Sequence, residues 1–302
     1  MPQLFLFPLP NPGKRASILI VCLWAFATLS ILSLAVANFV FQQIRFANFF
    51  IRSTISLPLA KSEVILTFIE RQNDETPEYD SFAELSQEQE RILCDNMKYN
   101  YYYVDKKTEE GEGKIIDESA LININLSPQA VISRLPGLDE ELVKEIAESS
   151  RRPFKLKEEL LLVEGMDKDK FNRFKGRITV YGSGQININT VSGDALAVLG
   201  LDNDLIEAII RYRQEYIGAD GEEGTEDDGA FTNSGAILSD LRNFYSLSTA
   251  QEQSLLSIMS SLDVKSGYLR LNVIPQVKGK AGTHYSILIF PQAKRILSWR
   301  EW

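Results

Sequence analysis

Six carboxylates crowd one short glycine-rich stretch, "GADGEEGTEDDGAF" (Gly218–Phe231). Hard oxygen ligands on a flexible turn suit Ca2+, and carboxylates packed this closely repel one another unless a cation lies among them. The spacing is not that of an EF-hand, because the glutamate expected at the twelfth position is missing. The stretch therefore predicts a calcium site, with a solvated loop as the alternative. The candidate ligands are Asp220, Glu222, Glu223, Glu226, Asp227 and Asp228.

Residue types that carry catalysis are otherwise scarce. His284 is the only histidine, which rules out a multi-histidine metal site and argues against a Ser-His-Asp triad. The sequence contains no Gly-rich phosphate loop, nucleophile elbow or metalloprotease motif. We therefore expect no enzymatic activity, and we expect His284 to lie at the end of a strand. Cys22 lies in an apolar run, so a disulfide with Cys94 is not expected.

One sequence pattern occurs twice in the chain. "LININLSPQAVISRLPGLDEELVKEI" begins at Leu121, and most of it returns 63 to 64 residues later as "QININTVSGDALAVLGLDNDLIEAI". In each copy a hydroxyl residue after "ININ", Ser127 or Thr190, is expected to cap a short helix. A glycine then turns the chain tightly into a second helix. The turns are Gly137–Asp139 and Gly200–Asp202, and a third Gly-apolar-Asp turn lies at Gly165–Asp167.

These turns resemble the helix-hairpin-helix, or SAM-like, module. When that module binds nucleic acid, its turn reads Gly-apolar-Gly, and backbone amides at a helix N-terminus face a phosphate. Here an aspartate replaces the second glycine in each turn, at Asp139, Asp167 and Asp202. Such a carboxylate can cap its own helix with the donors that a phosphate would need, and it repels the phosphate. The turns therefore predict a structural or protein-binding role.

The charge along the chain agrees, with one exception. Residues 1–52 hold four basic side chains and no acidic one, whereas the rest holds 28 basic and 41 acidic side chains, a formal charge of −13. An acidic body argues against binding to phosphate backbones, which requires Lys and Arg to replace counterions. The middle turn, "GMDKDKFNRFKGR", has five bases and two acids, and it keeps a DNA-binding hypothesis open.

An uncharged segment near the start predicts a membrane anchor. Ser17–Phe41 contains 25 residues without a charge. At about 1.5 Å per residue this length spans a hydrocarbon core of roughly 30 Å. Lys14 and Arg15 precede it, which predicts a cytoplasmic N-terminus and an exported body. The alternative is a cleaved secretory signal, for which "LAVANF" offers an exit sequence.

The helical pattern continues past this anchor. "QQIRFANFFIRSTISL" places apolar residues at helical spacing, and no glycine or proline follows Gly13 before Pro58. The pattern predicts one long helix, half in lipid and half on a soluble sheet. This geometry is typical of pilin-type subunits.

The remainder predicts an α+β body: an antiparallel sheet that an inserted helical domain interrupts. We expect a strand over Ser62–Glu70, a helix over Ser81–Met97, two strands joined by a charged turn within 98–125, and further strands after residue 261. The expected segments are a leader (1–16), a transmembrane helix (17–41), a first pilin-like part (42–126), the inserted helical domain (127–261, with repeats 121–182 and 185–245) and a second pilin-like part (262–302).

Together these features resemble protein K of bacterial type II secretion systems, the large minor pseudopilin. The resemblance covers nearly the whole chain and depends on the order of its segments. The segments are "RASILIVCLWAFATLS", "DESALININLSPQAVISRLPGL", "FKLKEELLLVEGM", "ITVYGSGQININT" and "ILSWRE".

The resemblance implies an anchor in the bacterial inner membrane with the globular part in the periplasm, a cytoplasmic leader that a prepilin peptidase removes, and methylation. The alignment places the cut between Ala16 and Ser17, although the family usually has glycine before the cut; Gly13–Lys14 is the alternative. Major pseudopilins carry a glutamate at the fifth mature position, which corresponds here to Val21, or to Ile18 for the alternative cut, and neither is acidic. A subunit without that carboxylate cannot make this contact to a subunit above it, which fits a place at the filament tip.

The resemblance also implies partners and a function. The expected function is to cap the pseudopilus with two other minor pseudopilins (I- and J-type), on top of the major pseudopilin and its inner-membrane assembly platform. Calcium in the globular part is a further family trait, and no nucleic acid is expected. Two other functions stay open from the residues themselves: a membrane-anchored helix-hairpin-helix DNA receptor of the competence type, and a calcium-binding adhesive or sensory protein.

Overall fold

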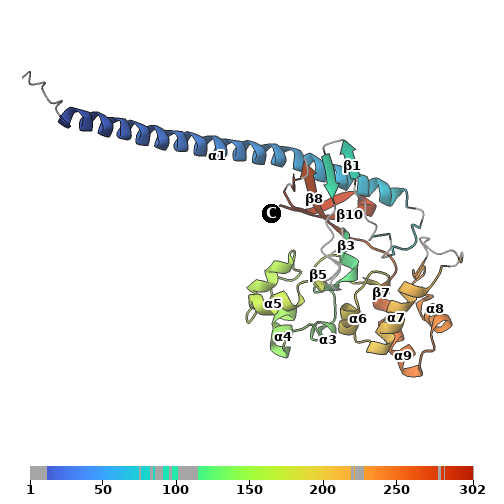
Figure 1. Cartoon of the computed structure of the whole chain (residues 1–302). Helices are drawn as coiled ribbons and strands as arrows, with labels where there is room; N and C mark the ends of the chain where they lie inside the picture. The colour runs from blue at the N-terminus through green and yellow to red at the C-terminus, as the bar shows by residue number, and fades with distance from the viewer. Residues whose placement is uncertain are drawn as a thin grey trace, which may run out of the picture. The chain divides into compact units, whose positions relative to one another are not determined.

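The computed structural model describes residues 12–74, 76–81, 84–85, 91–94, 97–100, 115–218, 221, 228–277, 280–281 and 283–301. The chain divides into two compact units, Met1–Ile55 and Ser56–Trp302. The first unit contains most of one long helix. The second contains the end of that helix, an antiparallel sheet and a block of short helices (Figure 1).

The long helix α1 spans Pro12–Gln72, 61 residues. It continues through Pro58, which has no N–H to donate to the preceding turn. Within the second unit, the buried side chains of α1 recur every three to four residues, which is the period of a helix with one face on a core. These buried residues are Ser56, Leu59, Ala60, Glu63, Val64 and Thr67.

The strand expected over Ser62–Glu70 is therefore wrong, because these residues belong to α1. The run "SEVILTFIE" is rich in residues that favour strands. Burial decides against that local preference: Glu63, Val64 and Thr67 are buried, while Ile65 and Ile69 are exposed. Only the helical period places these residues on opposite sides.

The sheet is antiparallel throughout, with the order β1-β2-β8-β10-β11 and with β3 and β9 also paired to β8. Because β3 and β8 are neighbours in the sheet, the helical block between them in sequence is an insertion. In the register of this pair, Asp117 lies opposite Leu269. The strands are β1 (Arg91–Cys94), β2 (Met97–Asn100), β3 (Ile115–Asp117), β8 (Leu269–Val277), β9 (Lys280–Ala281), β10 (Tyr285–Phe290) and β11 (Arg295–Glu301).

The helix expected over Ser81–Met97 is wrong from Arg91 on, because Arg91–Cys94 form β1 and Met97 begins β2. Glu84 and Leu85 are helical, and 86–90 lie outside the described residues. Antiparallel pairing of β1 with β2 supplies the backbone hydrogen bonds that a helix would otherwise form. The charged turn expected within 98–125 lies at 101–114, outside the described residues. The strands expected near the end of the chain are confirmed as β8, β10 and β11, and His284 directly precedes β10.

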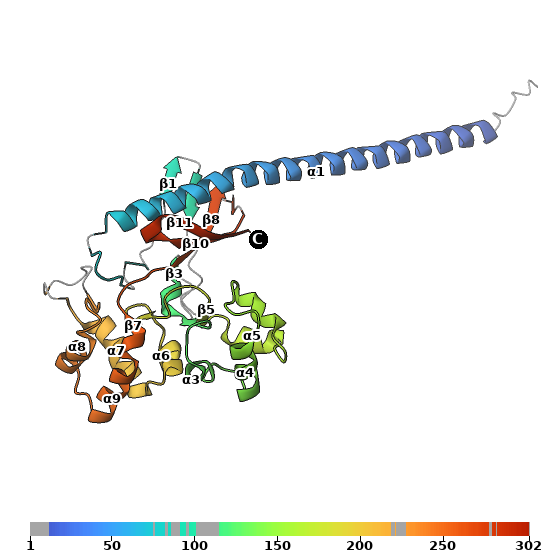
Figure 2. The ribbon, with the colours of Figure 1, turned by 180° about the vertical axis from the view of Figure 1, so that it is seen from behind.

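One face of the sheet packs against the last part of α1. Figures 1 and 2 show this part of α1 crossing the sheet over β8 and β10. Alternate residues of both strands point toward the helix, as the period of two requires. The shared apolar core consists of Ala60, Val64, Leu85, Leu269, Leu271, Val273, Tyr285, Ile287 and Ile289.

The helical block is built from two copies of one arrangement. Each copy begins and ends with a two-residue strand, and the two strands pair in parallel: β4 with β5, and β6 with β7. The first copy contains β4 (Ile122–Asn123), α3 (Gln129–Ile132), α4 (Glu140–Glu148), η2 (Lys157–Leu162), α5 (Lys168–Phe174) and β5 (Ile178–Thr179). The second contains β6 (Ile186–Asn187), α6 (Gly193–Leu199), α7 (Asn203–Glu215), α8 (Ile237–Phe244), α9 (Thr249–Ile258), η3 (Met259–Ser261) and β7 (Leu262–Asp263).

Both copies share one large apolar core, which includes Ile122, Phe174, Ile186 and Phe231. Two short 3-10 helices complete the second unit, η1 (Glu118–Ala120) and η4 (Pro291–Ala293). The expected α+β architecture is therefore confirmed: a long N-terminal apolar helix and an antiparallel sheet interrupted by helices.

Candidate functional site

The N-terminal part of α1 exposes an unbroken apolar surface. Trp24 and Phe26 are 71% and 72% exposed, and Phe39 is 61% exposed. Among the described residues, this is the one helix long and apolar enough to cross a membrane. Val21, the apolar residue at the fifth position after the expected cut, is exposed too. The backbone of the expected processing residues Gly13, Lys14, Ala16 and Ser17 is helical, and their side chains lie outside the described residues.

Each of the three tight turns is closed by its own aspartate. The glycines have the left-handed backbone that favours this residue, with φ of 86° at Gly137, 79° at Gly165 and 102° at Gly200. The aspartate two residues later is the N-cap of the next helix in every turn. Asp139 accepts from Leu142 N (2.8 Å), Asp167 from Lys170 N (2.7 Å) and Asp202 from Leu205 N (2.9 Å). These backbone donors are therefore occupied from within the chain.

Arginines of the chain itself cover two of the glycines. A Cβ on Gly200 would lie 2.6 Å from Nη1 of Arg134, which donates to Leu199 O at 3.0 Å. A Cβ on Gly137 would lie 3.1 Å from Cδ of Arg173. A ligand that approached either glycine would have to displace the arginine.

The basic middle turn forms ion pairs with aspartates of the helical block itself. Lys170 Nζ donates to Gly165 O at 3.1 Å and lies 3.7 Å from Asp139 Oδ2, so it joins the third turn to the first. Arg177 forms an ion pair with Asp194 in the second copy. Two of the five bases therefore form ion pairs within the block, and the side chain of Arg173 packs on Gly137.

The repeated "ININ" motif connects segments that are distant in sequence within each copy. The isoleucines are almost fully buried, and the second asparagine of each motif bonds the backbone of a distant phenylalanine. Asn125 donates to Phe154 O (2.9 Å) and accepts from Phe154 N (2.8 Å). Asn189 makes the same pair with Phe231, at 3.0 and 2.8 Å. These residues are structural, and the repeated motif binds the chain itself.

The two hydroxyl residues expected as caps do not cap. The N-cap of α3 is Pro128, without a side-chain hydrogen bond, and that of α6 is Ser192, which accepts from Ala195 N. Ser127 therefore lies one residue too early, because the chain turns through Pro128 before α3 starts. Thr190 instead donates from Oγ1 to Asp117 Oδ2 at 2.7 Å. Its hydroxyl belongs to a junction that links the helical block to the sheet.

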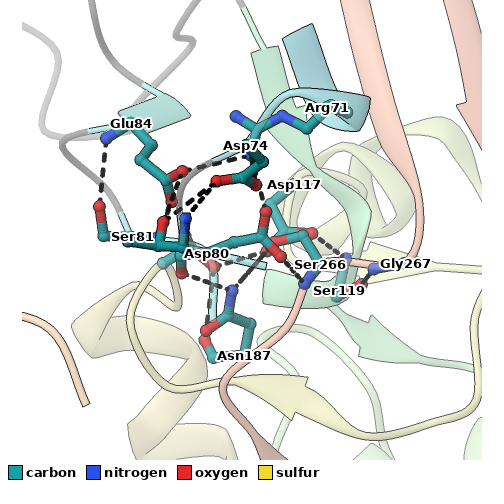
Figure 3. Close-up of polar contacts among 12 residues, drawn as sticks. Arg71, Asp74, Asp80, Ser81, Glu84, Asp117, Ser119, Asn187, Ser266 and Gly267 are labelled. Carbon is teal, nitrogen blue, oxygen red and sulfur yellow. Dashed lines mark hydrogen bonds and ion pairs between the residues drawn. The ribbon is translucent and has the colours of Figure 1, made fainter. Parts of the chain in front are cut away.

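This junction is centred on Asp117, which is 5% exposed. Figure 3 shows its carboxylate among Ser119, Asn187 and Ser266. Ser266 Oγ donates to Asp117 Oδ2 at 2.6 Å and Ser119 N donates to Oδ1 at 2.7 Å. Asn187 Nδ2 donates to Ser266 Oγ at 2.9 Å. The end of β3, the "ININ" of the second copy and the segment after β7 are thus held together at one buried carboxylate.

A second carboxylate joins this junction to α1. Asp80 accepts from Ser266 N at Oδ2 (2.7 Å), and its own backbone O accepts from Asn187 Nδ2 (3.1 Å). Arg71, in the last turn of α1, donates to Asp80 Oδ1 at 2.8 Å. The same Nη1 lies 3.3 Å from Asp74 and 3.5 Å from Glu84. One guanidinium therefore forms ion pairs with three carboxylates (Figure 3).

Ion pairs also attach the sheet to the first copy. Arg270 of β8 donates from Nε to Glu118 Oε1 at 2.5 Å, and Glu118 is 1% exposed on its side chain. Lys157 lies 4.0 Å from the same carboxylate, and burial lowers its pKa. Arg300 of β11 reaches Glu158 with two bonds, at 2.7 and 3.1 Å. The sheet thus meets α1 through apolar side chains and meets the helical block largely through charges.

Of the six candidate calcium ligands, Asp228 alone lies within the described residues. Its Oδ1 accepts from Gly218 N at 2.9 Å, and Gly229 N donates to Tyr216 O at 2.8 Å. The two ends of the acidic stretch are therefore side by side. Across the described residues, no three His, Cys, Asp or Glu side chains are arranged to hold a metal ion. Asp220, Glu222, Glu223, Glu226 and Asp227 lie outside them.

No protein-family model and no curated protein matches the chain. Among solved structures it is similar to a chain in the crystal structure of the GspK-GspI-GspJ complex from the type 2 secretion system of enterotoxigenic Escherichia coli. The match covers 86% of this chain and 99% of that one, with a TM-score of 0.54 and 16% identity. The two chains share a fold. The fold expected from the resemblance to protein K of type II secretion systems is thereby confirmed.

Proposed function

We propose that the chain is a minor pseudopilin that caps the tip of a type II secretion pseudopilus and assists protein export through contacts with other proteins. The observation that carries the proposal is the shared fold, which covers 86% of this chain. The solved neighbour belongs to a complex of three secretion-system proteins, GspK, GspI and GspJ. By analogy, the partners of this chain are two other minor pseudopilins of the I- and J-type.

The exposed side of α1 supports a helix–helix contact with such partners. While Ala60 and Val64 face the sheet, Ile65 and Ile69 are 58% and 46% exposed on the opposite side. They continue a series in α1 whose members alternate by four and three residues: Ile51, Ile55, Pro58, Ser62, Ile65 and Ile69. A seam with this spacing is the one that packs against a second helix.

The place at the tip and the membrane topology are further parts of the proposal. Val21 offers no carboxylate to a subunit above it, and the exposed apolar segment supports a single-pass anchor in the inner membrane. A cytoplasmic N-terminus follows from Lys14 and Arg15. Processing by a prepilin peptidase between Ala16 and Ser17, or between Gly13 and Lys14, precedes assembly on the major pseudopilin and the inner-membrane platform.

Calcium binding by the acidic stretch is part of the same proposal. Gly218 N donates to Asp228 Oδ1 at 2.9 Å, so the acidic stretch begins and ends at neighbouring residues. Its six carboxylates offer the hard oxygen donors that Ca2+ prefers. The ion would offset the mutual repulsion of these carboxylates.

Co-purification from the membrane tests the main proposal. The full chain is co-expressed with I- and J-type minor pseudopilins, and a tagged copy is captured in detergent. We expect both partners to be recovered. Ile65→Asp/Ile69→Asp should abolish this recovery, whereas Leu256→Asp, at a leucine of α9 that is 55% exposed, should retain it. Failure of the wild-type chain to recover either partner would contradict the proposed function.

A further inference from the structure

The junction between α1 and the helical block carries more buried negative charge than the neighbouring cations balance. Arg71 is the one cation in contact with Asp74, Asp80 and Glu84 among the described residues. All four side chains are at most 15% exposed. A single guanidinium can neutralise one of these charges, so two remain where water screens them little.

Asp117 adds a fourth carboxylate to this junction cluster, defined here as Arg71, Asp74, Asp80, Glu84 and Asp117. Ser266 connects it directly, because its N–H donates to Asp80 and its hydroxyl donates to Asp117. Thr190, Ser119 and Asn187 also donate to Asp117. Within the described part of the chain, no basic side chain forms an ion pair with Asp117.

The charges that face the cluster from surrounding elements do not remove the imbalance. Lys265, after β7, faces Asp80, but its ammonium lies 3.1 Å from Glu78. Glu118, next to Asp117, is occupied by Arg270 and Lys157. Each neighbouring cation therefore has a carboxylate of its own.

Protonation relieves this excess charge. Burial is the main cause that raises the pKa of Glu84 to about 7 and that of Asp117 to about 6. Burial likewise raises the pKa of Asp80, against the opposing effects of the Ser266 N–H and of Arg71. The hydrogen bonds from Ser266 and Thr190 lower the pKa of Asp117, but by less than burial raises it.

We propose that the junction cluster is a pH-sensitive clamp, which holds the helical block firmly to the end of α1 at mildly acidic pH and loosens as the pH rises to neutral. Three parts of the fold meet at these side chains and their partners: the last turn of α1 with the segment after it, the end of β3, and the second repeat copy (Figure 3).

The sign follows from proton binding. Because these carboxylates have higher pKa values in the folded chain than in the unfolded chain, the folded chain binds more protons between about pH 4 and 7. The cluster's contribution to stability is fully present below that window and is lost as the pH rises through it. Acidification over this range therefore tightens the junction.

Two measurements on the full chain in detergent test the clamp. We expect a higher thermal midpoint at pH 5.5 than at pH 8, and we expect Glu84→Gln to reduce this difference by about half, since the neutral amide no longer titrates. Hydrogen exchange, corrected for intrinsic rates, should slow at pH 5.5 in peptides covering 73–81 and 264–268. Asp139→Asn is the matched control: it neutralises an aspartate outside the junction and should leave the midpoint difference unchanged.

An unchanged midpoint difference in Glu84→Gln would overturn the proposal. So would equal protection of the two peptides at both pH values. If Glu84→Gln does not fold, the exchange measured on the wild-type chain decides alone.

Discussion

Arg134 of the first repeat copy lies over Gly200 of the second, with Nη1 2.6 Å from the position that a Cβ would take. It donates to Leu199 O, at the C-terminal end of α6. The arginine thus caps a helix of the other copy and needs a residue without a side chain beneath it. The two copies fit each other at the turn that a nucleic acid would otherwise use.

Gly200→Ala should be clearly destabilising. The alanine would have to adopt φ near 102° and would collide with Arg134, so we expect a loss of about 1–3 kcal/mol in the free energy of unfolding. Chemical denaturation of the full chain in detergent measures it. Gly176→Ala is the control, because nothing lies within 4 Å of its Cβ position, and it should change stability little. Equal effects of the two substitutions would contradict the account of this turn.

The turn aspartates should matter as caps. Asp202→Ala removes the acceptor for Leu205 N, and a lost N-cap costs about 0.5–2 kcal/mol. Asp202→Asn keeps an oxygen acceptor and should recover most of that stability. The same denaturation series compares the two variants. If the asparagine were as destabilising as the alanine, charge rather than capping would be the contribution of Asp202.

The two equivalent asparagines should differ in cost. Asn189→Ala leaves Phe231 N–H and C=O without their side-chain partner in a fully buried site, which should cost about 2–4 kcal/mol. Asn125→Ala breaks the same pair to Phe154, but Asn125 is only half-buried, so water can replace part of the loss. We expect a smaller effect there. The reverse order would show that burial does not set the cost.

Binding to duplex DNA should be absent at about 150 mM salt. The turn amides are bonded to aspartates, and the basic middle turn is engaged by Asp139, Asp194 and Gly137. Fluorescence anisotropy with the full chain in detergent measures this. Micromolar binding with a steep salt dependence, weakened by Lys168→Glu/Lys175→Glu, would instead favour a DNA receptor.

Ca2+ should raise the thermal midpoint, and Asp227→Ala/Asp228→Ala should remove that increase. The physical reason is the loss of two hard oxygen ligands from a loop whose ends are already joined. Glu140→Ala/Glu141→Ala, at two adjacent exposed acids of α4, should keep it. An increase that survives in Asp227→Ala/Asp228→Ala would place the ion elsewhere.

Sequence patterns predicted the features that depend on neighbours in the chain. The long helix, the terminal strands and the insertion follow from local periodicity, and the N-caps at Asp139 and Asp202 follow from residue type at a turn. The strand expected at Ser62–Glu70 was wrong, because packing against the sheet buries this segment with the period of a helix. No sequence signal pointed to the junction. Arg71 and Asp80 are nine residues apart, but Asp117 and Ser266 lie much further along the chain, and only the fold brings the four together.

The helical block leaves and re-enters the sheet at directly opposed residues, Asp117 and Leu269. In an antiparallel pair such residues are only about 4.5–5.5 Å apart, a gap that a two-residue hairpin closes. The block could therefore be deleted: a short turn that joins β3 directly to β8 would leave a plain pilin-type sheet. The same architecture lets a subunit gain a bulky helical block by one insertion event, while the long helix and its contacts with the sheet stay as they are.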